Sequence, residues 1–201
     1  PLYAHLPLIL SPDRSKMSKR NSLTSLLEYR REGYLPEAMV NFLVLLGWHP
    51  KSDHEVFGLN ELIKEFDLRR VQKAGAVFGQ AKLEWLNSRY FKEMKTETIL
   101  ERLKPFLEAT PPWRGASEEM LKKIIEIERG RMKTLKDFMK SSAFFFKLPD
   151  YEASLLQWKQ EPMTKVKTIL EKILSILEEI ASEKFTHAII LKSLSDLTEK
   201  E

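Results

Sequence analysis

The chain has 201 residues, of which 43% are hydrophobic and 31% charged, a composition typical of folded globular proteins and not of disordered ones. The formal net charge of +4 permits an anionic partner without specifying one. Cysteine is absent, which excludes disulfides, thiolate zinc sites and cysteine nucleophiles and favours a cytoplasmic protein. The longest apolar stretch, Val40 to Trp48, falls short of the roughly 20 residues of a membrane span.

Both ends of the sequence read as cuts within a longer protein. The first residues contain neither an initiator Met nor the pattern of a signal peptide. The last residues, Asp196 to Glu201, follow a helical pattern without a stop signal. We therefore expect a longer parent protein.

Apolar residues recur at three- and four-residue spacing through most of the chain and glycine is scarce, so the fold class is predicted to be mainly α. The one good strand candidate is Leu6 to Leu10, which ends at the turn-forming Ser11-Pro12-Asp13. The first helices are predicted at Leu23–Glu32 (cap Ser22, stop Gly33), Pro36–Gly47, Glu61–Phe66 (cap Asn60), Leu68–Gln72 (cap Asp67) and Lys82–Asn87.

The second half contains the clearest linker, Thr110 to Gly115, and the strongest amphipathic pattern, Met163 to Ala181. Pro105 is expected to bend or interrupt the helix around it, and most of Phe144 to Phe146 is expected to be buried. The helices predicted here are Glu97–Glu108 (start Thr96), Ser117–Arg129, Thr134–Lys140, Met163–Ala181 and Thr186–Leu197.

The segment Ser15-Lys16-Met17-Ser18-Lys19-Arg20 carries the most chemical information. Its two lysines lie three residues apart with a hydroxyl residue between them, a pattern that can wrap the oxygens of a triphosphate. On residue types alone, a solvated basic turn is the commoner explanation of such a sequence.

The neighbouring residues change that interpretation, because the segment resembles the KMSKS signature of class I aminoacyl-tRNA synthetases, often K-[LIM]-S-K-R in the glutamyl branch. Other segments are similar to the bacterial-type glutamyl-tRNA synthetase family and follow in the order found in that family. They are Ala4–Leu10, Tyr29, Gly33–Ala38, Asn41–Leu43, Leu46–Trp48, Val77-Phe78, Lys82-Leu83 and Trp85–Asn87. The resemblance covers roughly the first ninety residues. It implies that Lys19 contacts ATP, while Lys16 and Arg20 assist it or contact the tRNA acceptor arm.

One departure from the family pattern is Asn21, where a basic or His residue followed by Gly is common. The family's other signature, an H-x-G-H-like motif, is absent, and no His of this chain belongs to one. We therefore expect the chain alone not to aminoacylate. The intact enzyme is implied to use ATP with Mg²⁺ to join L-glutamate to tRNA(Glu), and no metal site is predicted within the chain itself.

The region from Thr96 onward is similar in position and helical character to the anticodon-binding domain of the same family. Its best local match is Arg129-Gly130-Arg131-Met132-Lys133-Thr134-Leu135, where Arg131 matches a residue that reads the third anticodon base. Arginine can hydrogen-bond and stack with unpaired bases. The tRNA-binding candidates are Arg131, Arg129, Lys133 and Arg114. A solvated basic turn remains the other interpretation of this segment.

These observations divide the chain into residues 1–95, the end of the catalytic domain with the ATP loop and tRNA stem-contact region, and residues 96–201, a helical anticodon-binding domain truncated at its C-terminus. We expect a monomer. The alternatives are a stand-alone helical RNA-binding module without catalytic activity and a helical scaffold. An upstream coding region with the missing signature would favour the synthetase, and salt-dependent tRNA binding would exclude the scaffold.

Overall fold

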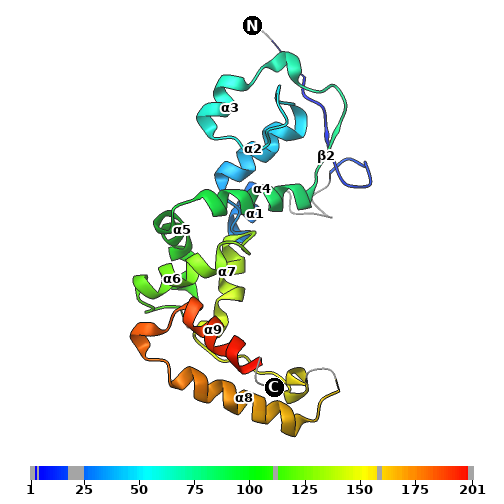
Figure 1. Cartoon of the computed structure of the whole chain (residues 1–201). Coiled ribbons are helices and arrows are strands. Elements are labelled where there is room, and N and C mark those ends of the chain that lie inside the picture. The colour runs from blue at the N-terminus through cyan, green and yellow to red at the C-terminus, as the bar shows by residue number, and fades with distance from the viewer. Residues whose placement is uncertain (1–2, 4, 18–24, 111–112, 158–159, 199–201) are drawn as a thin grey trace. The chain divides into compact units, whose positions relative to one another are not determined.

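The protein is described by a computed structural model that covers residues 3, 5–17, 25–110, 113–157 and 160–198 (Figure 1). Within these residues the chain is mainly helical with a short parallel sheet, which confirms the predicted fold class. It forms two compact units, Pro1–Leu148 and Pro149–Glu201. The predicted division after residue 95 lies inside the first unit and stays a prediction about functional parts.

The first unit contains two strands, β1 (Ile9–Leu10) and β2 (Ala76–Val77), which pair in parallel. Its α-helices are α1 (Leu26–Glu32), α2 (Pro36–Gly47), α3 (Leu59–Glu65), α4 (Gln80–Glu93), α5 (Thr96–Ala109), α6 (Glu118–Glu128) and α7 (Leu135–Ser141), joined by the 3-10 turns η1 (Leu68–Arg70) and η2 (Ala143–Phe145). The second unit contains η3 (Ala153–Leu156), α8 (Met163–Glu178), η4 (Ser182–Lys184) and α9 (His187–Thr198). Within this unit α8 and α9 contact each other.

Several boundaries differ from the predicted ones because another residue satisfies the helix end. Helix α1 begins at Leu26, since the side chain of Ser25 accepts from Leu27 and forms a capping box with Glu28; the predicted start Leu23 and cap Ser22 lie outside the described residues. Helix α3 begins after Gly58, with Asn60 inside it. The predicted cap Asp67 is confirmed, as are the predicted helix starts at Ser117 and Thr134, where both residues are the N-caps.

Tertiary contacts account for the larger differences. Strand β1 is shorter than predicted and β2 was not predicted, because two residues carry no readable alternation. Helix α4 is more than twice as long as the predicted Lys82–Asn87, and Pro105 does not interrupt α5. Of the three phenylalanines, Phe144 is 53% exposed, while Phe145 and Phe146 are partly buried against the core.

Two apolar clusters meet along α4, which Figure 1 shows running from β2 toward the start of α5. One cluster joins α1, α2 and the first half of α4 and includes Tyr29, Phe42 and Leu83. The other joins α5, α6 and α7 and also takes in Leu35 and Phe91. Because this second cluster extends across residue 95, both sides of the predicted division share a core.

A backbone contact between Gly33 and Leu135 fixes how α1 and α7 meet. The Leu135 amide donates to the Gly33 carbonyl over 3.0 Å. Gly33 ends α1 in the left-handed region, with φ of 85°, as predicted. A Cβ at Gly33 would stand 2.7 Å from the Leu135 backbone nitrogen, so a side chain at this position would disrupt the contact.

Substitution of Gly33 by alanine is therefore expected to be costly. Left-handed strain and the steric overlap with Leu135 together should lower the free energy of unfolding by roughly 2–4 kcal/mol. The matched control is Gly115→Ala, because Gly115 has φ of 93° and nothing within 4 Å of its added Cβ. The control should lose only about 1–2 kcal/mol in denaturant unfolding. Equal losses would contradict a steric role for Gly33.

Candidate nucleic-acid interface

The described part of the basic loop is a tight turn that presents Lys16 to solvent. Asp13 accepts from the Ser15 amide at 2.9 Å and from the Ser15 hydroxyl at 2.7 Å, and these bonds lower the pKa of Asp13. The backbone of Lys16 forms an antiparallel β-bridge with Leu10, and the Lys16 side chain has no ion pair among the described residues. Met17 packs against the cluster of Tyr29 and Phe42. The predicted contacts Ser18, Lys19 and Arg20 lie outside the described residues.

Two of the predicted tRNA-binding residues, Arg129 and Arg114, donate hydrogen bonds to other residues of the chain. Arg129 donates to the Lys92 carbonyl over 2.7 Å and to the carboxylate of Glu126 over 3.0 Å. Arg114 donates twice, over 2.8 and 3.1 Å, to the Glu108 carbonyl near the end of α5. Both guanidiniums thereby satisfy carbonyl groups near helix ends that would otherwise lack a partner.

The other two predicted contacts face solvent on the turn between α6 and α7. Lys133 pairs with Glu84 at 2.9 Å, which raises the pKa of its ammonium, and its side chain is 61% exposed. Arg131 is 79% exposed, and its guanidinium lies 3.6 Å from the buried carboxylate of Glu128. A surface pair such as Lys133–Glu84 contributes little stability and can open at low cost.

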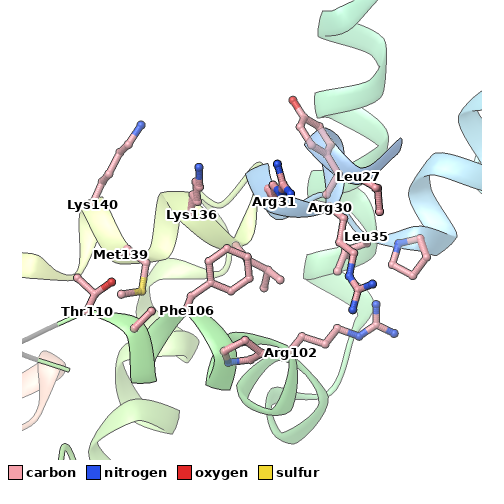
Figure 2. Close-up of a pocket in the computed structure, with 15 residues that line it drawn as sticks. Leu27, Arg30, Arg31, Leu35, Arg102, Phe106, Thr110, Lys136, Met139 and Lys140 are labelled. Carbon is pink, nitrogen blue, oxygen red and sulfur yellow. The ribbon is translucent and has the colours of Figure 1, made fainter. Parts of the chain in front are cut away.

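A groove of about 900 Å³ lies between α1, the start of α2, α5 and α7 (Figure 2). Apolar side chains form much of its lining, including Leu35, Phe106 and Met139. Tyr34 also lines it; the Tyr34 hydroxyl accepts from Gln80, and burial raises its pKa to about 12. This hydroxyl is therefore neutral at physiological pH.

All the charged residues that line the groove are cations. Figure 2 shows Arg30 and Arg102 toward one end and Lys140 at the other. Five cations and no carboxylate are among the lining residues, which are Arg30, Arg31, Arg102, Lys136 and Lys140. Arg102 pairs with Glu37 and Lys136 with Glu32, whereas Arg30, Arg31 and Lys140 have no ion pair among the described residues. Such a surface favours an anionic ligand.

The whole chain matches two family models. Residues 1–85 match the catalytic domain of class I tRNA synthetases (E and Q), and residues 83–201 match an anticodon binding domain. The chain belongs to the glutamyl-tRNA synthetase family.

Individual members of this family are similar along most of the chain. The glutamate–tRNA ligase of Moorella thermoacetica is 41% identical over 73% of the chain and 31% of its own length. Glutamate–tRNA ligase 2 of Thermoanaerobacter pseudethanolicus is 39% identical over 92% of the chain and 39% of its own length. A crystal structure of a glutamate tRNA ligase from Elizabethkingia meningosepticum in complex with its amino acid superposes with a TM-score of 0.77 and 35% identity. The superposition includes all of this chain and 42% of the Elizabethkingia chain.

The chain thus spans about two fifths, or less, of the length of these synthetases. Among the described residues there is no group of three His, Asp or Glu side chains that could hold a metal ion. No helix in the described part of this synthetase chain is long and apolar enough to cross a membrane.

Sequence reasoning missed the cations of the groove because they come from three separate helices. Arg30 and Arg31 occupy the last turn of α1, Arg102 lies on α5, and Lys136 and Lys140 lie on α7. The four-residue spacing of the two lysines on one helical face was a readable signal. No sequence pattern indicated that α1 would lie beside that face of α7.

The Glu37–Arg102 pair beside the groove should make stability depend on pH. Two bonds of 2.8 and 2.5 Å from Arg102 lower the pKa of Glu37 below its usual 4.5. The carboxylate therefore contributes stability above the usual pKa and loses it as the pH falls through the folded-state value.

We expect Glu37→Gln to lower the free energy of unfolding at about pH 6 and to have a smaller effect at about pH 3. Denaturant unfolding at both pH values measures this difference. The control Glu65→Gln removes an exposed carboxylate that has no ion pair among the described residues. The control should show little change in free energy at either pH, and a constant penalty for Glu37→Gln would contradict the role of the pair.

Proposed function

We propose that this chain supplies the ATP loop and the RNA-binding region of a glutamate–tRNA ligase. The intact enzyme would activate L-glutamate with ATP to glutamyl-adenylate and transfer the glutamyl group to the 3′ end of tRNA(Glu). The observation that carries this proposal is the continuous match of the catalytic and anticodon-binding models along the chain. The relatives' names agree with it.

The loop would act on the activation step. An oxygen of the glutamate carboxylate attacks the α-phosphorus, the bond to the bridging oxygen breaks, and pyrophosphate leaves with the negative charge. Lys19 would hold that charge more strongly in the transition state than in bound ATP, with Lys16 and Arg20 assisting. Mg²⁺ would arrive on the phosphates of ATP, the usual mode for this ion, and the chain alone is expected to be inactive.

The groove and the turn after α6 would contact the tRNA. Arg30, Arg31 and Lys140 are cations without ion pairs among the described residues, so they can contact phosphates without breaking an existing bond. Arg131 would contact the third anticodon base, and Lys133 would exchange Glu84 for a phosphate. Arg129 and Arg114 would add positive charge while their donors bond carbonyl groups. We place this activity in the cytoplasm and propose a monomer.

Binding of the 201-residue chain to tRNA(Glu) should weaken as salt rises, because phosphate contacts release counterions. Loss of two phosphate contacts in Arg31→Ala with Lys140→Ala should reduce the slope of log affinity against log salt by about 2. A filter-binding or fluorescence titration at several salt concentrations measures this slope.

The matched control replaces Lys51 and Lys64, two exposed cations outside the groove, by alanine. The control should retain the slope of the wild type. An equal change in both double variants would show that only net charge matters. Absence of any salt-dependent binding to tRNA(Glu) by the folded chain would contradict the proposed RNA-binding role.

A further inference from the structure

Glu128, the last residue of α6, is a charged residue inside the core. It is 1% exposed and is one of the largest fully buried side chains. Neither carboxylate oxygen receives a hydrogen bond from the described residues. Burying an ionised carboxylate without donors costs several kcal/mol, so a residue of this kind suggests a role beyond packing.

Arg131 is the cation that the structure places beside this carboxylate. Its Nη1 lies 3.6 Å from Glu128 Oε1, close enough for an ion pair but too far for a good hydrogen bond. The neighbouring Arg129 bonds the Lys92 carbonyl and Glu126 instead. Among the described residues, Arg131 is therefore the cation that pairs with Glu128.

Hydrogen bonds hold the backbone around Arg131, while its side chain extends to the surface beside Glu128. The amides of Arg131 and Met132 donate to the Glu128 carbonyl over 2.8 and 3.2 Å, and Met132 is 1% exposed. The Arg131 side chain is 79% exposed. Its contact with Glu128 leaves the other guanidinium donors facing solvent. A carboxylate screened from water attracts this cation more strongly than a surface carboxylate would.

We propose that Glu128 is a positioning residue that orients the guanidinium of Arg131 for contact with a nucleotide base. This inference rests on the proposed tRNA-binding function. The carboxylate would occupy one side of the guanidinium and leave two parallel N–H groups for a base edge, the geometry in which arginine recognises bases. Because the side chain would already be oriented, less conformational entropy would be lost on binding.

The test measures binding of the full chain to tRNA(Glu) and to the same tRNA with its third anticodon base replaced. Glu128→Gln keeps the shape of the side chain and removes its charge. It should reduce affinity for tRNA(Glu) roughly 2- to 10-fold, the range expected for one freed side chain, and should reduce the preference between the two RNAs. The same substitution in an Arg131→Ala background should have no further effect.

Stability separates this role from a merely structural one. Because Glu128→Gln removes an unsatisfied buried charge, the free energy of unfolding should stay the same or rise while base preference falls. The matched control, Glu126→Gln, alters a neighbouring exposed carboxylate that pairs with Arg129, and should leave base preference unchanged. A Glu128→Gln variant that loses stability, or loses affinity equally in the Arg131→Ala background, would overturn the proposal.

A readout without RNA separates this inference from the proposed function. The side-chain Nε–H of Arg131 should show restricted motion in ¹⁵N relaxation and become mobile in Glu128→Gln. Restricted motion in a chain that binds no tRNA would contradict the proposed function and keep the positioning contact. Equal mobility in both proteins would overturn the positioning contact whatever the RNA result.

Discussion

The first unit depends on a small set of buried backbone contacts where the end of α1 meets the start of α7. The Gly33 carbonyl accepts from the Leu135 amide. The side chain of Asn87, fully buried on α4, bonds the segment that follows Gly33 and the segment that precedes Leu135. Its amide oxygen accepts from Leu35 over 2.9 Å, and its nitrogen donates to the Lys133 carbonyl. A buried polar group of this kind is costly unless satisfied, so it favours one arrangement of three helices over others.

A second buried asparagine makes similar contacts one turn further along α4, at Tyr90. Asn41 on α2 accepts from the Phe57 amide over 2.7 Å and from the Tyr90 hydroxyl over 2.8 Å, and it donates to Glu55. Burial raises the pKa of Tyr90 to about 12, so this hydroxyl remains a donor at physiological pH. Both asparagines therefore hold α4 against segments that are distant in sequence, so α4 connects the other elements of the unit.

The geometry of the candidate interface depends on these contacts. Lys133 and Thr134 lie in the segment that Asn87 holds, so the turn carrying Arg131 is anchored at its C-terminal side by a core contact. The groove cations come from α1, α5 and α7, and α1 meets α7 through Gly33. Charge distribution and backbone packing are thus linked: a change in the Gly33–Leu135 contact would move the cations of α1 relative to those of α7.

The sequence by itself determined the mainly helical class, the cap at Asp67, the helix start at Ser117, the glycine that ends α1 and the family resemblance, because these depend on residues close together in the chain. Tertiary structure alone decided the pairing of β1 with β2, the full length of α4 and the gathering of five cations around one groove. These features depend on contacts between segments far apart in sequence, such as Leu35 with Asn87. The burial of Glu128 belongs to the same group, since a helix pattern cannot reveal which charged residue a neighbouring helix will cover.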